Sequence, residues 1–289
     1  MAAAPSRVGD WITLAKIRLN TLVVATTAGG YYMAAFGDID LLRLAVTCLG
    51  TALVAAGASA FNQVSERHTD ALMDRTRARP VAVKRMSPYE GRVVAGVLSA
   101  VGLAVLGFAI NVLAMWVALA TLLSYAVLYT PMKRLTSFST VVGAVPGALP
   151  PMIGWAASRG SITDVAGWSL FFIMFVWQLP HFLAIAWIYR EDYGRAGLPM
   201  LTVIDHTGAM TGRQMVLWAA TLLPVSVLPT VFNLASQVYG IGVLVLGLAQ
   251  FALTVRFAFS RTKTNARAVF YASIIYLPLL WALMAFAKT

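Results

Sequence analysis

The 289-residue sequence is poor in the residues that make a protein soluble. Only 11% of its residues are charged while 60% are hydrophobic, whereas soluble domains have roughly a quarter charged residues and about half apolar ones. Cys48 is the only cysteine, so no intrachain disulfide forms and a disulfide scaffold is excluded. Because this much apolar surface has to face lipid, the sequence predicts an all-α integral membrane protein.

Acidic residues are also scarce, with 11 Asp and Glu against 22 Lys and Arg. In a soluble protein that balance would suggest nucleic acid as a partner. Here the cations lie between apolar runs, where the positive-inside rule accounts for them, so no nucleic acid partner is expected. With a cytoplasmic amino terminus only Arg43, Arg159 and Lys288 fall outside, leaving 19 of the 22 on the cytoplasmic side.

The long apolar runs predict about nine transmembrane helices, since a helix that crosses a bilayer needs about 20 mostly apolar residues. Residues 1–18 form a cytoplasmic or interfacial extension without a recognisable signal peptide, and a bacterial inner membrane is the simplest location. The inner connections 64–91 and 190–214 are long and hold most of the Asp, Glu and His. The predicted spans are 19–36, 42–63, 92–110, 112–130, 138–157, 167–189, 215–233, 237–256 and 268–287.

The clearest chemical pattern lies at the cytoplasmic end of the second span. Asn62, Glu66 and Asp70 are spaced four residues apart, so a continuing helix places them on one face. Mg²⁺ binds one or two carboxylates together with water and phosphate oxygens, so the pattern predicts a magnesium site. A solvated helix end is the alternative, and a polar Asn62 inside the membrane argues against it.

Several cations and one further carboxylate elsewhere in the sequence are candidates to act together with this pattern. Asp192, in the second long loop, is a candidate to complete the metal site from the opposite side of a cavity. Arginine and lysine side chains bind phosphate oxygens, although each of these also serves as an orientation signal. The candidates for diphosphate binding are Arg75, Arg79, Lys133, Arg134 and Arg190.

A second group of polar residues lies inside the sixth span, around Pro180. Gln178 and His181 are polar at membrane depth, where such residues are functional candidates. Imidazole ligates haem iron or transfers a proton. The alternative is a hydrogen bond to a backbone carbonyl that Pro180 leaves free.

The sequence resembles the intramembrane aromatic prenyltransferases, and within them the protohaem IX farnesyltransferases or haem O synthases. The resemblance rests on the Asn62–Asp70 pattern and on four further strings, which together cover residues 62 to 201. It differs from the general pattern in having Gln63 and Glu66 where many members carry Asp, and in lacking a second carboxylate four residues from Asp192. The four strings are Tyr129–Thr136, Gly147–Trp155, Trp177–Phe182 and Asp192–Leu201.

The resemblance implies a single membrane domain over residues 1–289, with nine helices around a central cavity. It implies Mg²⁺ dependence with an uncertain number of ions, farnesyl diphosphate as donor, haem B as acceptor and haem O as product. Asn62, Glu66, Asp70 and Asp192 would then hold Mg²⁺ on the diphosphate, and Trp177, Gln178 and His181 would lie near the haem, with His181 as a hypothetical iron ligand. A haem A synthase is a possible partner. Two alternatives stay open: prenyl transfer to a quinone precursor such as 4-hydroxybenzoate, and a haem transporter or chaperone without enzymatic activity.

Overall fold

The computed structural model describes residues 6–289, and its regular structure is helical throughout that range. Two of the helical segments, η1 and η2, are π-helical turns. The elements are α1 (Arg7–Ala15), α2 (Ile17–Ala34), α3 (Leu41–Asp70), α4 (Pro88–Ala104), η1 (Val105–Ile110), α5 (Val112–Leu123), η2 (Ser124–Tyr129), α6 (Thr130–Met132), α7 (Ser139–Ala148), α8 (Pro150–Arg159), α9 (Val165–Ile188), α10 (Arg190–Arg195), α11 (Leu201–Ile204), α12 (Ala209–Val231), α13 (Gln237–Phe259) and α14 (Lys263–Phe286).

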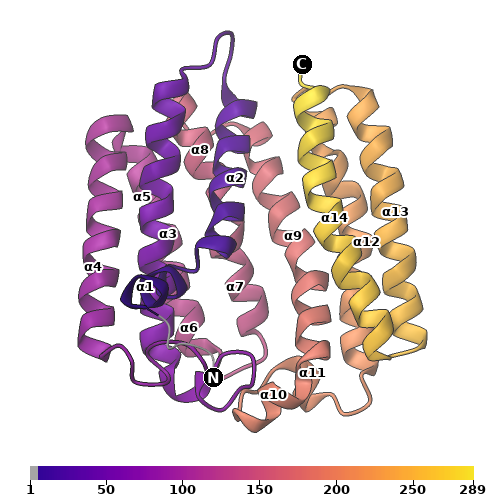
Figure 1. Ribbon diagram of the computed structural model, residues 1–289. Coiled ribbons are helices and arrows are strands. Elements are labelled where there is room, and N and C mark those ends of the chain that lie inside the picture. The colour runs from indigo at the N-terminus through magenta and orange to yellow at the C-terminus, as the bar shows by residue number, and fades with distance from the viewer. Residues whose placement is uncertain (1–5) are drawn as a thin grey trace.

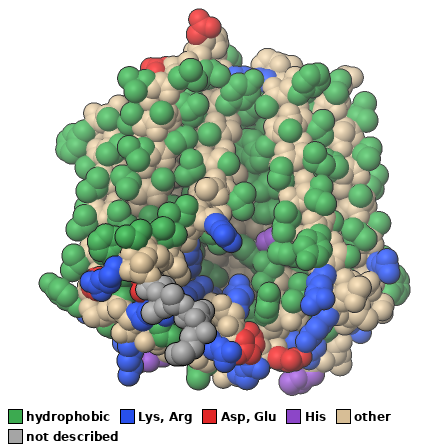
Figure 2. All heavy atoms as spheres, in the orientation of Figure 1, with side chains coloured by type: hydrophobic (Ala, Val, Ile, Leu, Met, Phe, Trp, Pro, Cys, Tyr) green, Lys and Arg blue, Asp and Glu red, His purple; other side chains and the backbone are tan. Residues whose placement is uncertain are grey.

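The long helices form one bundle of roughly parallel rods, with the amino-terminal half on one side and α12, α13 and α14 on the other (Figure 1). Helix α1 lies across the bundle direction at the end that also carries α10 and α11, and the carboxyl terminus lies at the opposite end (Figure 1). The chain is therefore a multi-pass integral membrane protein, as predicted. Lys and Arg side chains gather at the α1 end, below a belt of hydrophobic side chains (Figure 2).

Eight helical stretches between residues 6 and 289 are long and apolar enough to cross a membrane. Helix α2 is not among them, because Arg18, Asn20 and the small polar residues near Thr26 dilute its apolar character. It nevertheless runs beside α3 and α8 within the bundle (Figure 1). The count of nine spans and the side on which the amino terminus lies both stay predictions.

One predicted helix boundary was wrong, and one helix extends past its predicted span. Helix α3 continues past the predicted span 42–63 to Asp70, as the spacing of Asn62, Glu66 and Asp70 requires. Gln63 in this helix is buried and donates to the carbonyls of Thr13 and Leu14 at the end of α1. The sequence also predicts that Asp192 ends the helix that begins near Gly167, and this prediction is wrong. That helix, α9, ends at Ile188, and Asp192 lies on the separate helix α10.

Small residues set the closest helix contacts. A Cβ atom added to Gly30 on α2 would lie 2.0 Å from the Pro151 carbonyl oxygen, and one added to Gly154 on α8 would lie 1.9 Å from the Thr27 carbonyl oxygen. The backbones of α2 and α8 therefore approach as only glycine permits, which is how small residues bring membrane helices together. The break at Leu149, followed by Pro150 and Pro151, gives α8 its direction.

Candidate active site

A stack of three polar side chains lines a cavity at the α1 end of the bundle. Asn62, Glu66 and Asp70 are respectively 3%, 5% and 0% exposed, although two of them are carboxylates. All three line one cavity of about 390 Å³. The predicted helical face is therefore confirmed, because α3 continues through all three positions without interruption.

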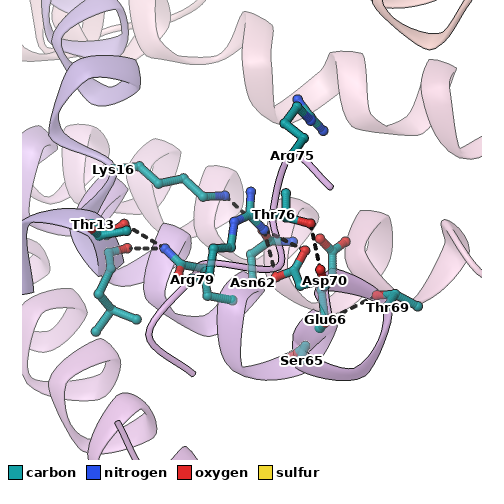
Figure 3. Close-up of polar contacts among 12 residues, drawn as sticks. Thr13, Lys16, Asn62, Ser65, Glu66, Thr69, Asp70, Arg75, Thr76 and Arg79 are labelled. Atoms are coloured by element: carbon teal, nitrogen blue, oxygen red, sulfur yellow. Dashed lines mark hydrogen bonds and ion pairs between the residues drawn. The ribbon is translucent and has the colours of Figure 1, made fainter. Parts of the chain in front are cut away.

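Each member of the stack is paired with a different cation. Lys16 donates to Asn62 Oδ1 over 2.9 Å, and Lys133 donates to Glu66 Oε1 over 2.8 Å. Arg79 donates to both oxygens of Asp70, over 2.8 and 2.7 Å. Buried carboxylates need such partners, because an isolated buried charge is very costly. Lys16, Arg79 and the stack converge in Figure 3.

Lys16 is the site residue that the sequence did not single out. It joins α1 to α2 in a left-handed conformation, with φ 48°, and that turn directs its side chain into the cavity from outside α3 (Figure 3). Burial, and after it the nearby Arg79 guanidinium, lowers the pKa of Lys16 to about 7. In the sequence, Lys16 and Arg18 resemble an ordinary positive-inside cluster. Only the contact with Asn62 identifies Lys16 as a residue of the site.

The remaining predicted cations divide into two groups. Arg75 lines the cavity, donates to the Tyr193 hydroxyl over 3.2 Å and stands apart from the stack (Figure 3). Arg134 instead donates to the Ser65 carbonyl at the protein surface. Arg190 lies over the Trp187 ring, 4.6 Å from its centroid. The structure therefore brings Arg75, Arg79 and Lys133 to the cavity but not Arg134 or Arg190.

Asp192 is not among the residues that line the cavity. Its carboxylate pairs with Arg195, one turn along α10, and Arg195 also pairs with the exposed Asp74. The neighbouring Tyr193 faces the cavity instead. In this arrangement Asp192 lies outside the wall of the cavity that Asp70 lines, so its role as a metal ligand stays a prediction.

The donor set fits Mg²⁺ when phosphate oxygens complete the coordination. Within residues 6–289 no three His, Cys, Asp or Glu side chains are grouped to hold a metal by themselves. The stack supplies two carboxylates and an amide oxygen, which agrees with the few protein ligands that Mg²⁺ takes when phosphates supply the others. Nearby cations suit the diphosphate that would accompany the ion.

Aromatic residues and small helix residues form the apolar part of the cavity. The π-helical turn η2 presents Tyr125 and Tyr129 to it. Gly143 and Gly147 on α7 leave the space that Tyr129 and Gln178 occupy. Such a chamber, apolar at depth and charged at one end, suits a substrate with an apolar chain and an anionic head group.

The three residues predicted from the sixth span lie together on α9. Gln178 and His181 line the cavity. Gln178 donates to the carbonyls of Ala144 and Met174, neither of which is the Val176 carbonyl that Pro180 leaves free. Trp177 is 9% exposed and lies behind the wall, where its indole N–H donates to the Ser273 carbonyl.

Residues 22–283 match the model of the UbiA prenyltransferase family. The chain belongs to the UbiA prenyltransferase family. This match extends over nine-tenths of the chain and confirms the resemblance on which the sequence analysis relied.

Curated relatives of similar length support a narrower placement within the UbiA family. The chain is 43% identical over 284 residues to a protoheme IX farnesyltransferase from Solibacter usitatus, covering 95% of this chain and 97% of that protein. It is 40% identical to the protoheme IX farnesyltransferase of Salinibacter ruber, covering 95% of this chain and 97% of that protein.

Solved structures of other membrane proteins share the fold. A structure of a digeranylgeranylglyceryl phosphate synthase matches with a TM-score of 0.80 at 14% identity, covering 97% of this chain and 98% of that one. A UbiA homolog from Archaeoglobus fulgidus, bound to GPP and Mg²⁺, matches with a TM-score of 0.67 at 16% identity, covering 96% of this chain and 99% of that one. These matches agree with the all-helical membrane fold.

Proposed function

We propose that the protein is a Mg²⁺-dependent protohaem IX farnesyltransferase. It transfers the farnesyl group of farnesyl diphosphate to a vinyl group of haem B and adds water, giving haem O and diphosphate. The observation that carries this proposal is the stack of Asn62, Glu66 and Asp70 at the mouth of a largely apolar cavity. The names of the curated relatives support haem B as the acceptor.

The reaction breaks the allylic C–O bond of farnesyl diphosphate, so negative charge grows on the departing diphosphate. A Mg²⁺ ion held by Asn62, Glu66 and Asp70 stabilises that charge when bound. Lys16, Arg79 and Lys133 already point toward the oxygens of the stack. They can therefore turn from those oxygens to the diphosphate without leaving the cavity.

The apolar part of the cavity protects the allylic cation from water until the vinyl carbon attacks it. The new C–C bond leaves a carbocation beside the porphyrin ring, and a water molecule adds its oxygen there and releases a proton. No covalent enzyme intermediate is required. We propose that Gln178 and His181 lie beside the haem, that Trp177 supports His181 from behind the cavity wall, and that Asp192 joins the metal site when α10 moves toward the stack.

The finer assignments belong to the same proposal. The amino terminus lies in the cytoplasm of a bacterial cell with the protein in its inner membrane, and residues 1–289 form one domain whose active-site loops lie within 64–91 and 190–214. Arg75, Arg134 and Arg190 assist diphosphate binding or mark the cytoplasmic side. A haem A synthase is a candidate partner, because it would consume haem O.

Removing the metal tests the proposal. Purified protein in lipid nanodiscs is given farnesyl diphosphate and haem B, and haem O and diphosphate are both measured while Mg²⁺ is titrated against a chelator. We expect both products to appear in equal amounts and to disappear together when the metal is removed. Haem binding without diphosphate release would support a carrier instead, and prenylation of 4-hydroxybenzoate but not haem B would support a quinone-precursor enzyme.

Lys16→Met is expected to raise the KM for farnesyl diphosphate about tenfold, because a charge-assisted contact contributes about 1.5–3 kcal/mol. Methionine keeps an unbranched side chain of nearly the same length and removes the ammonium group. Arg18→Met is the matched control, since Arg18 lies two residues away and is exposed. Equal KM values for Lys16→Met and the unmodified protein would remove Lys16 from the diphosphate site.

A further inference from the structure

His181 is held on one edge by a serine of another helix. Its Nδ1 lies 2.7 Å from the hydroxyl oxygen of Ser273 on α14. Ser273 is fully buried and is not among the cavity-lining residues, whereas His181 lines the cavity. The Nδ1 edge of the ring therefore points into the protein, and the opposite edge, with Nε2, points toward the cavity.

The hydrogen bonds of Ser273 determine which nitrogen of His181 carries the proton. The Ser273 hydroxyl lies 2.6 Å from the Phe270 carbonyl oxygen. A carbonyl oxygen only accepts, so the one hydroxyl proton of Ser273 goes to Phe270. The Ser273 oxygen then accepts from Nδ1–H, and a neutral imidazole with a proton on Nδ1 has none on Nε2.

Aromatic neighbours fix the plane of the same ring. Trp177 stacks on His181 with ring centroids 5.1 Å apart and an interplanar angle of 21°, and Phe270 does so at 5.1 Å and 29°. The Trp177 indole N–H donates to the Ser273 carbonyl over 3.0 Å, so α14 contacts both residues. Among the hydrogen bonds of residues 6–289, Nε2 of His181 has no partner.

We propose that Ser273 is a positioning residue that holds His181 with a bare Nε2, ready to ligate the iron of a porphyrin. This inference rests on the proposed function, because it assumes that haem B is the acceptor. A histidine that ligates a metal usually donates its other N–H to an oxygen atom, which fixes the tautomer and the ring orientation. An iron ligand on α9 would hold the porphyrin at a fixed orientation, and with it the vinyl group that attacks the farnesyl cation.

Porphyrin binding separates this role from a purely structural one. Full-length protein in nanodiscs is titrated with iron protoporphyrin IX and, separately, with metal-free protoporphyrin IX. Ser273→Ala is expected to lower the affinity for the iron porphyrin about tenfold, since second-shell changes typically cost 10–100-fold, and to alter the iron–histidine stretching band in the resonance Raman spectrum. The affinity for the metal-free porphyrin should change less than twofold.

Two further variants complete the comparison. Ser273→Thr keeps a hydroxyl and should restore both the affinity and the Raman band. Ser169→Ala is the matched control, because Ser169 is buried and donates to a carbonyl three residues earlier, as Ser273 does, but lies on α9 and is not the hydrogen-bond partner of His181. It should leave the spectrum of the bound haem unchanged.

Nitrogen NMR of the protein without porphyrin tests the tautomer without any substitution at Ser273. The chain has three histidines, and loss of one signal in His181→Gln assigns the resonances of His181. We expect the nitrogen that lacks a proton to be Nε2. A bare Nδ1 would overturn the inference.

The outcomes separate this inference from the proposed function. If the unmodified protein binds iron porphyrin through His181 and Ser273→Ala leaves affinity and spectrum unchanged, the role of Ser273 is wrong while the farnesyltransferase proposal stands. An equal loss of affinity for both porphyrins would show a structural role and also overturn it. If the unmodified protein binds no iron porphyrin, haem is not the acceptor and both proposals fail.

Discussion

Asp70→Asn is expected to lower the rate of farnesyl transfer by about 10²–10³-fold, the usual cost of removing one group that stabilises charge in a transition state. Asp70 is the most deeply buried member of the stack, and both of its oxygens accept from Arg79. Asparagine keeps the shape but removes the negative charge that holds the divalent ion. The measurement is the initial rate of haem O formation across a Mg²⁺ titration.

Asp74→Asn provides the matched control for this experiment. Asp74 continues the four-residue spacing beyond Asp70, but its side chain is 59% exposed and pairs with Arg77 and Arg195 at the surface. The rate of haem O formation by Asp74→Asn should stay within about twofold of that of the unmodified protein. A normal rate for Asp70→Asn would contradict a metal site built on the buried stack. An equal loss of activity in both variants would contradict it as well.

Gly154→Ala is expected to destabilise the bundle by about 1–3 kcal/mol, the cost of overpacking a close contact. The added Cβ would lie 1.9 Å from the Thr27 carbonyl oxygen and 2.6 Å from the Tyr31 backbone nitrogen. Backbone atoms cannot rotate away as a side chain does, so α2 and α8 have to separate. Thermal unfolding in detergent should show a lower midpoint.

Activity should fall in the same variant, because Val23 of α2 and Ile153 of α8 both line the cavity. The matched control is Gly96→Ala, a glycine-to-alanine change inside α4 with no atom within 4 Å of the new Cβ. Removal of a helical glycine there should leave stability unchanged or slightly raise it. Equal midpoints for the Gly154 and Gly96 variants would show that the α2–α8 contact adapts easily.

The spans and the stack of polar residues were predictable because apolar length and helical spacing are both properties of a single helix. Asn62, Glu66 and Asp70 lie on one face whatever surrounds α3, and residues 237–256 of the prediction differ little from the observed Gln237–Phe259. The position of Asp192 was harder to predict from the sequence. The end of α9 near Tyr189 and the separate short helix α10 depend on how the loop packs.

Gln63 shows the same limit in a different way. In the sequence, Gln63 looks like a metal ligand in which Asp has been replaced. In the structure it follows Asn62 on a different face of α3 and donates to the end of α1. Its partners are backbone carbonyls about 50 positions earlier in the chain. No local pattern around residue 63 identifies them.

By itself the sequence determined that this protein is a helical membrane protein with oxygen ligands and cations at one end, because hydropathy and helical spacing are local properties of the chain. The tertiary structure decided which cation meets which ligand: Lys16 with Asn62, Lys133 with Glu66 and Arg79 with Asp70. It also brought Ser273 to His181 across 92 positions of the chain. These pairings depend on where helices cross, and close crossings such as that of α2 and α8 are set by packing between segments distant in the sequence.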